Sequence, residues 1–226
     1  PVRRILLGMP VDQIELPIES FTVRSADGLL IRAHKVGTGP HRWLLPPGMG
    51  TPLLCWKYVM EAFAPKMTIV TWDQRGTYDS EAPSTPDGLA IERHVDDGLA
   101  VLESLDWGDE PFVTGGWSMG VQIGLEIYRR MPQRIAGLTL INGAAEHPLK
   151  TAYGPALTRP LLAAVLRGLV VAAPKLNSLW GPLCFSGYFG RLVMALRVAR
   201  ANEPFVTAVT QELARMDLQN YLQILV

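Results

Sequence analysis

One serine, Ser118, stands between glycines in the stretch GGWSMG, residues 115 to 120. Gly116 and Gly120 lie two residues before it and two residues after it, which is the G-x-S-x-G spacing of a nucleophilic serine on a sharp turn between a strand and a helix. Such a turn strains the backbone of the serine and brings neighbouring segments too close for larger side chains. The spacing therefore predicts that this hydroxyl attacks an acyl carbon and forms an acyl intermediate.

Two backbone N–H groups are expected to stabilise the oxyanion that this attack would create. The run VQIGLEIYRR places a helix N-terminus directly after the serine, so the N–H of Met119 is the first candidate donor. The second candidate is the N–H of Met49 in the stretch LLPPGMG, where Gly48 and Gly50 let the backbone approach a substrate oxygen. The alternative interpretations are a plain strand-to-helix turn at the serine and a proline-fixed turn before the next helix.

An acyl transfer through serine also needs a base and an acid. His34 is expected on a solvated strand face, His41 in a turn, and His94 in a surface or capping position near the start of a helix. His147 follows the last predicted strand and lies at the correct edge of the sheet, and Glu146 beside it is the matching candidate acid. The alternative for His147 is that it is merely solvated, as loop histidines usually are.

The residues around these candidates alternate between strand-like and helix-like patterns, which is typical of an α/β fold with a mostly parallel sheet. Residues 21–25 and 29–36 flank the turn ADG and predict an N-terminal antiparallel hairpin. Four runs predict further, buried strands: residues 42–46, 67–73, 111–117 and 135–142. Apolar residues at helical spacing connect them: Leu53, Trp56, Met60 and Phe63, then Ile91, Val95, Leu99, Leu102 and Leu105.

The pattern changes after Gly143, where residues 157–173, 189–201 and 203–225 predict helices. We therefore expect two parts: residues 1–143 as the α/β core and residues 144–226 as a helical cap over the ends of the strands. Ligands in such an arrangement bind between the cap and the strand ends, and an apolar cap favours an apolar substrate group. The alternative is that these apolar side chains simply pack the cap onto the core. The candidate substrate-binding residues are Trp117, Trp180, Phe185 and Phe189.

The composition excludes several classes of protein. Lys plus Arg number 21 and Asp plus Glu number 21, so no net charge draws the chain to nucleic acid or anionic lipid. The longest apolar run, residues 161–173, contains Arg167 and is shorter than the roughly 20 residues of a membrane span. Cys55 and Cys184 lack metal-ligand spacing and fit a reducing, cytoplasmic compartment. We expect a small-molecule substrate, no metal, no cofactor and no nucleic-acid partner, and the oligomeric state stays open.

Three motifs together resemble the α/β-hydrolase superfamily, in particular its capped esterase-like and haloperoxidase-like enzymes. They are PPGMG at 46–50, WDQRGTYDS at 72–80 and GGWSMG at 115–120. The resemblance implies that the first motif is an oxyanion loop, with Pro47 in place of the usual His or Asn. It implies that the second motif is mainly structural, with Asp73 and Arg75 fixing a turn by hydrogen bonds, and that the third carries the nucleophile.

The resemblance also implies a catalytic acid after a seventh strand and a histidine after an eighth, neither of which is evident before Val226. The expectation is therefore the N-terminal part of a longer serine hydrolase that acts on an ester or related acyl substrate, inactive as an isolated chain. The alternatives are a non-catalytic ligand-binding or partner-binding protein of the same fold, and an acyltransferase or perhydrolase.

Overall fold

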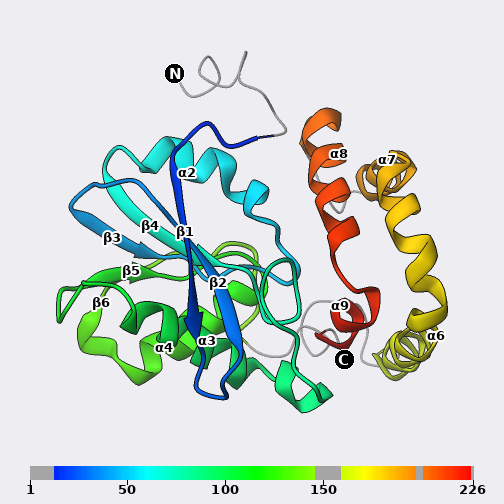
Figure 1. Ribbon diagram of the computed structural model, residues 1–226, viewed down its shortest axis with the longest axis horizontal. Coiled ribbons are helices and arrows are strands. Elements are labelled where there is room, and N and C mark those ends of the chain that lie inside the picture. Colours follow the sequence, from blue (N-terminus) through cyan, green and yellow to red (C-terminus); the bar gives the residue numbers. More distant parts are fainter. Residues whose placement is uncertain (1–12, 146–158, 197–200, 225–226) are drawn as a thin grey trace.

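A computed structural model describes residues 13–145, 159–196 and 201–224 (Figure 1). Six strands form one sheet in the order β1-β2-β4-β3-β5-β6. β1 pairs with β2 and β2 with β4 in antiparallel register, whereas β3–β4, β3–β5 and β5–β6 are parallel pairs. The predicted α/β architecture, with its N-terminal antiparallel hairpin and mostly parallel remainder, is confirmed. The strands are β1 (Ile18–Arg24), β2 (Leu30–Val36), β3 (His41–Leu44), β4 (Met67–Trp72), β5 (Phe112–Thr114) and β6 (Ile135–Leu138).

Helices cover both faces of the sheet. The 3₁₀ turn η1 (Leu53–Trp56) leads directly into α2 (Lys57–Phe63). The other α-helices are α3 (Ile91–Glu103), α4 (Met119–Arg130), α6 (Arg159–Phe185), α7 (Tyr188–Ala195), α8 (Glu203–Glu212) and α9 (Leu218–Ile224). Three-residue and four-residue turns of 3₁₀ helix are η2 (Pro86–Leu89), η3 (Pro132–Arg134) and η5 (Leu213–Arg215).

The alternation of side chains along the strands builds two hydrophobic cores. Leu44 and Val70 pack with the apolar faces of α3 and α4. Their neighbours Trp43 and Ile69 point to the opposite face and pack with Trp56 and Met60 from η1 and α2. Both faces are buried, which explains why these central strands read as continuous apolar runs.

The strand β6 differs from the expectation of a buried strand. Among the described residues β6 pairs only with β5, and Leu138, Leu140 and Ile141 on and after it are exposed. The difference has a simple cause: a strand at the edge of a sheet has one neighbour, and its outer side chains meet no second partner.

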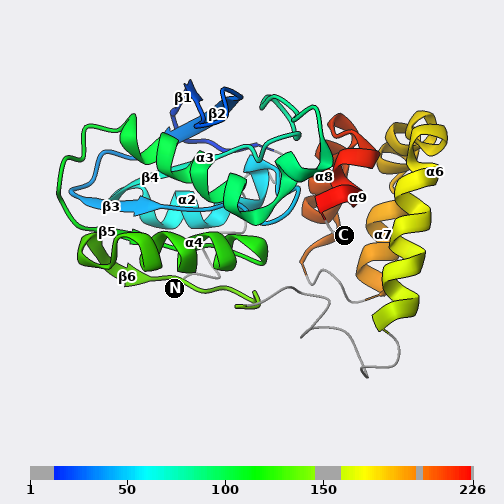
Figure 2. The ribbon, with the colours of Figure 1, turned by 90° about the horizontal axis from the view of Figure 1, so that it is seen from below.

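The helices α6 to α9 pack together at one end of the sheet (Figures 1 and 2). α6 extends well beyond the predicted 157–173 and contains Pro174 and Pro182. An internal proline removes a helical hydrogen bond, yet the buried face with Ala173, Trp180 and Cys184 packs against the neighbouring helices. Tertiary packing therefore overrides the local preference of the prolines to end the helix.

The single helix expected over 203–225 is divided into α8, η5 and α9. Met216 is extended, with ψ 146°, and is buried. The carboxylate of Asp217 then accepts a 2.9 Å hydrogen bond from the backbone N–H of Asn220 and caps the next helix.

No helix in the described ranges is long and apolar enough to span a membrane.

Candidate active site

Ser118 lies on a strained turn between the strand β5 and the helix α4. Its backbone angles are φ 56° and ψ −117°, outside the regions that residues with a Cβ atom normally adopt. The turn is held by a 3.0 Å hydrogen bond from the N–H of Ser118 to the carbonyl of Ile141. The hydroxyl has no hydrogen-bond partner among the described residues and stands at the carboxyl end of the parallel strands.

The glycines around the serine are required by close packing. A Cβ atom on Gly116 or on Gly120 would lie closer than 3.0 Å to the carbonyl oxygen of Pro46. A Cβ atom on Gly124 would meet the backbone of Gly115 at a similar separation. The turn and the first part of α4 therefore pack directly on the backbone of the segment after β3.

That segment, residues 46–50, is named here the 46–50 loop. The N–H of Gly50 donates a 2.9 Å hydrogen bond to the side-chain oxygen of Gln74, and the carbonyl of Gly50 accepts a 2.8 Å hydrogen bond from the hydroxyl of Tyr78. Gly48 accepts a hydrogen bond from the N–H of Thr51. The N–H groups of Met49 and Met119 donate no hydrogen bond to any described residue.

The residues after β4, named here the 73–80 turn, form a buried polar network. Arg75 is fully buried and donates to both carboxylate oxygens of Asp97, at 2.8 and 2.5 Å. It also donates to Asp27 at 2.7 Å and to the carbonyl of Gly88 at 2.8 Å. The hydrogen bond from Arg75 holds the pKa of Asp27 below its ordinary value. Arg75 therefore connects the 73–80 turn to the turn of the β1–β2 hairpin and to the helix α3.

The histidines differ from the sequence expectation. His34 is buried, not solvated: its ring lies 2.9 Å from the hydroxyl of Ser20 and 3.4 Å from a carboxylate oxygen of Asp73. His94 is also fully buried, not a surface or capping residue. Burial and the charge of Arg75 lower the pKa of His94 to about 3, so this ring is neutral near pH 7. His94 lies on the face of the amphipathic helix α3 that packs against the core. The sequence did not indicate this, because a residue near the start of a helix is usually exposed or a cap.

Residues of α9 and of the segment before it contact the candidate site. A Cβ atom on Gly50 would meet Met216 and the ring of Tyr221, and one on Gly76 would approach Asn220. The guanidinium of Arg215 lies 5.7 Å over the ring of Tyr78. These contacts bring α9 and the residues before it against the 46–50 loop and the 73–80 turn.

The candidate substrate-binding residues have different surroundings. Trp117 is partly exposed beside the serine, and Phe185 is exposed on α6. Trp180 is buried among the helices, where its ring N–H donates to the carbonyl of Leu213 and its edge meets Phe189. Glu146 and His147 lie outside the described residues.

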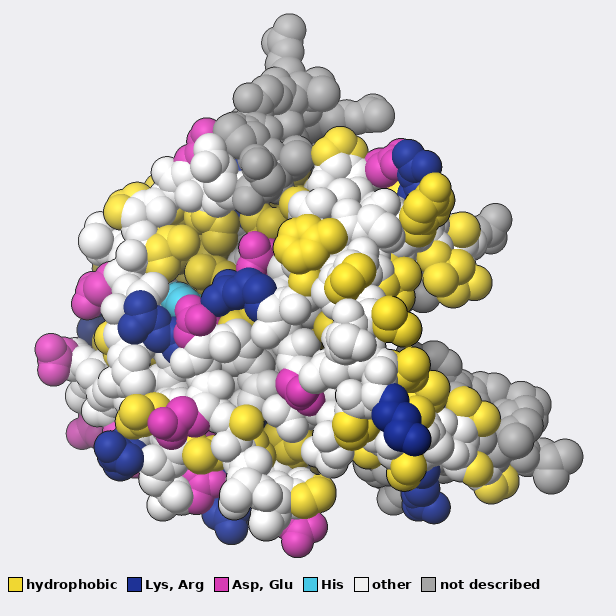
Figure 3. All heavy atoms as spheres, turned by 45° about the vertical axis from the view of Figure 1, so that its right-hand side comes forward, with side chains coloured by type: hydrophobic (Ala, Val, Ile, Leu, Met, Phe, Trp, Pro, Cys, Tyr) yellow, Lys and Arg dark blue, Asp and Glu magenta, His cyan; other side chains and the backbone are white. Residues whose placement is uncertain are grey.

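Exposed apolar side chains gather on the helices α6 and α7, at the right of the molecule in Figure 3. They include Val165, Leu169, Leu176, Leu179, Leu183 and Leu192, and the exposed Leu196 directly follows α7.

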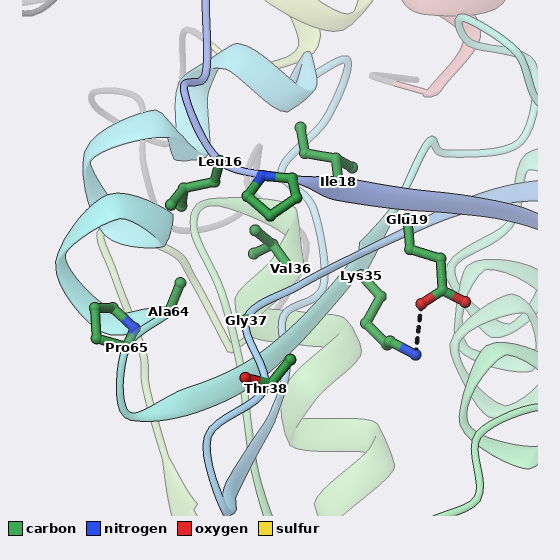
Figure 4. A pocket seen from close by; sticks show the side chains of 10 residues that line it. Leu16, Ile18, Glu19, Lys35, Val36, Gly37, Thr38, Ala64 and Pro65 are labelled. Carbon is green, nitrogen blue, oxygen red and sulfur yellow. Dashed lines mark ion pairs between the residues drawn. The ribbon is translucent and has the colours of Figure 1, made fainter.

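A pocket of about 470 Å³ lies elsewhere, between the start of β1, the end of β2 and the end of α2 (Figure 4). Leu16, Ile18, Val36 and Ala64 line its apolar part, and the 2.7 Å ion pair of Lys35 with Glu19 lies at its rim. No candidate site residue lines this pocket.

Sequence reasoning did not identify Gln74, Tyr78, Met216 or Tyr221 as neighbours of the site. Gln74 and Tyr78 belong to the motif WDQRGTYDS, which the resemblance implies is mainly structural. One signal was available in the sequence: the polar residue Gln74 follows the predicted strand 67–73. The carboxyl ends of parallel strands lie at one edge of the sheet, which is the edge that carries Ser118.

Comparisons with known proteins identify the family and the fold. A family model described as the alpha/beta hydrolase fold matches residues 44–168. The chain is 35% identical over 99 residues to "Putative carbamate hydrolase RutD" of Agrobacterium fabrum, which covers 44% of this chain and 37% of that protein. It is 26% identical over 129 residues to proline iminopeptidase of Elizabethkingia meningoseptica, which covers 56% of this chain and 43% of that protein. The matched segments span less than half the length of these two curated relatives.

Solved structures share the fold. An epoxide hydrolase of Bacillus megaterium in complex with an inhibitor matches with a TM-score of 0.66 at 19% identity, covering 91% of this chain and 70% of that chain. A thioesterase domain from the curacin biosynthetic pathway matches with a TM-score of 0.59 at 17% identity, covering 87% and 67%. Since the family model covers more than half of the 226 residues, the chain belongs to the alpha/beta hydrolase fold family.

Proposed function

We propose that this protein is a serine hydrolase in which Ser118 is the nucleophile toward an ester or related acyl substrate. The single observation that carries the proposal is the backbone of Ser118, which holds φ 56° and ψ −117° at the junction of β5 and α4. Strain of this kind persists only where surrounding structure enforces it, and it is common at active sites. The packing of Gly116 and Gly120 against Pro46 supplies that enforcement.

In the proposed reaction, the oxygen of Ser118 attacks the acyl carbon of the substrate and forms a tetrahedral intermediate. The N–H groups of Met49 and Met119 donate hydrogen bonds to its oxyanion, helped by the N-terminal dipole of α4. The carbon–oxygen bond to the alcohol then breaks, and the alcohol leaves with a proton. Water attacks the acyl-enzyme, releases the acid and restores the serine hydroxyl.

A base and an acid must accompany the serine. Among the described histidines, His34 is bonded to Ser20 and Asp73, and His94 is fully buried. His41 is the exposed first residue of β3 rather than part of the expected turn, so it lies at the opposite end of that strand from the 46–50 loop. None of these three is the proposed base. His147 and Glu146 stay as candidates from the sequence. The order nucleophile, acid, histidine along the chain, which is usual in α/β-hydrolases, supports an acid and a base that follow Ser118.

We also propose that residues 144–226 act as the cap and residues 1–143 as the core. The contacts of Met216 and Tyr221 with Gly50 support this assignment, because they lay the helical part over the 46–50 loop. An apolar acyl or alcohol group would then rest against the helices, which predicts activity that rises from acetyl to medium-chain esters.

The test is covalent labelling of the gene product that carries this sequence with a fluorophosphonate, alongside ester hydrolysis. Ser118→Ala should abolish both. The matched control is Ser20→Ala, since the hydroxyl of Ser20 lies 2.9 Å from the ring of His34 but Ser20 is on an ordinary extended strand. Labelling that survives in Ser118→Ala, or no labelling of the unaltered protein, would refute the proposal.

A further inference from the structure

Gln74 lies in the 73–80 turn with its side chain buried between the 46–50 loop and the nucleophile turn. Only 1% of its surface is exposed. Its amide oxygen accepts the 2.9 Å hydrogen bond from the N–H of Gly50, and its amide nitrogen donates to the carbonyl of Pro47 at 3.3 Å. The same nitrogen lies 3.9 Å from the sulfur of Met119. One side chain thus touches both segments that supply the proposed oxyanion donors.

The two backbone groups that Gln74 binds flank Met49 in the chain. Pro47 precedes Gly48 and Met49, and Gly50 follows them, so both sides of this short segment are tied to one amide group. Gly50 has a positive φ of 56°, a conformation that glycine leaves readily. Fixing both ends of the segment therefore fixes the direction of the Met49 N–H.

Tyr78 binds the loop from the other end of the same turn. Its hydroxyl donates to the carbonyl of Gly50, opposite the N–H that Gln74 accepts from. Gly50 is consequently held on both sides, by two residues of a single motif. Stabilisation of an oxyanion depends on donors whose orientation is set before the reaction, so this clamp matters for rate more than for affinity.

We propose that Gln74 is a positioning residue that sets the orientation of the Met49 N–H relative to Met119, an inference that rests on the proposed serine hydrolase function. An amide is the side-chain group that suits this task because it both donates and accepts. A carboxylate of the same length accepts but cannot donate to Pro47, and a thioether of similar length does neither well.

The experiment compares Gln74→Met and Gln74→Glu in the gene product that carries this sequence, by steady-state hydrolysis and by the rate of fluorophosphonate labelling. Gln74→Met should lower kcat about 10- to 100-fold with KM changed less than about twofold, because misplaced donors cost transition-state rather than ground-state binding. Gln74→Glu should lie between Gln74→Met and the unaltered protein.

Ser80→Ala is the matched control. The hydroxyl of Ser80 donates to the carbonyl of Asp73 at 2.8 Å and accepts from the N–H of Arg32 at 2.9 Å, so it braces the far end of the same turn without touching the 46–50 loop. Its loss should lower Tm while kcat of the folded protein stays unchanged. Equal kcat losses in Ser80→Ala and Gln74→Met would show a merely structural role and overturn the inference.

Hydrogen exchange at the Gly50 amide supplies a readout that does not require activity. Exchange should be faster in Gln74→Met and unchanged in Ser80→Ala. If the protein shows no Ser118-dependent hydrolysis but Gly50 exchange still accelerates, the proposed function fails while the clamp on the loop stands. If hydrolysis depends on Ser118 but neither kcat nor Gly50 exchange responds to Gln74→Met, the inference is overturned and the proposed function stands.

Discussion

The backbone carbonyl of Pro46 occupies the space that a side chain at Gly116 would need. A Cβ atom on Gly116 would lie closer than 3.0 Å to that oxygen, and so would one on Gly120. The loop after β3 and the turn after β5 are therefore in direct backbone contact. This contact, rather than any side chain, sets the separation between the segments that carry Met49 and Ser118.

Replacing Gly116 by Ala should destabilise the protein by several kcal/mol, because the clash is with backbone and cannot be relieved by a rotamer change. Gly168→Ala is the control: a Cβ atom there meets no atom within 4 Å, and Ala in a helix is favoured over Gly by about 0.5–1 kcal/mol. Urea unfolding measures both. Equal stability of the two variants would contradict the packing described.

Because the backbone of Ser118 is strained, replacing this residue by glycine should raise the free energy of unfolding. Ser118→Gly should stabilise the protein by about 1 kcal/mol, since glycine adopts positive φ without steric cost. Ser118→Ala keeps the Cβ atom and should leave the free energy of unfolding within about 0.5 kcal/mol of the starting value. Both variants should lose hydrolysis. Thermal or urea unfolding that ranks Gly at or below Ala would argue against strain.

The buried Arg75–Asp97 pair should be costly to break. Arg75→Met leaves Asp97 charged and unpaired in the core, which should destabilise the protein by about 3–5 kcal/mol. Adding Asp97→Leu should recover part of that loss, because the unpaired charge is then gone. Arg129→Ala, which removes an exposed ion pair with Glu126, should cause no measurable change in unfolding. A double variant less stable than Arg75→Met would contradict this account.

His94 should make the protein sensitive to acid. Its pKa is about 3 in the folded protein and about 6.5 when unfolded, so below pH 6.5 the unfolded chain binds the extra proton. The contribution of the neutral His94 ring to the free energy of unfolding is fully present above about pH 6.5 and is lost as the pH falls toward 3. The free energy of unfolding should therefore fall by about 2 kcal/mol between pH 7 and pH 5.

Unfolding measured from pH 7 to pH 4 in the protein and in His94→Leu tests this expectation. The variant should show a smaller slope of stability against pH, and at pH 5 it should lose less than the parent. The ring of His94 lies by the backbone of Leu89 but forms no hydrogen bond of ordinary geometry within the described part of the chain, so an apolar replacement sacrifices little hydrogen bonding there. An identical slope in both proteins would assign the acid sensitivity to other groups.

The fold was predictable because its signals are local. The continuous apolar runs in 42–46 and 67–73 mark β3 and β4, and a strand followed by GGWSMG and an amphipathic run marks the turn before α4. The glycines around Ser118 also follow from local geometry, since a sharp turn at one residue crowds its near neighbours. Their specific contact, the carbonyl of Pro46, was not predictable.

Other features depended on contacts between distant segments. The burial of His34 requires Asp73, which is 39 residues away in the chain, and the continuation of α6 through Pro174 requires its packing on the neighbouring helices. Local patterns carry no information about such partners. The expectation of a solvated His34 failed for this reason.

The sequence by itself determined the α/β architecture and the position of Ser118 on a strand-to-helix turn, because spacing and hydrophobic period act over a few residues. Only the tertiary structure placed Gln74 and Tyr78 on the 46–50 loop and α9 over Gly50. The physical reason is that parallel strands bring their carboxyl ends to one edge, where residues from separate loops meet according to strand order and packing rather than sequence distance.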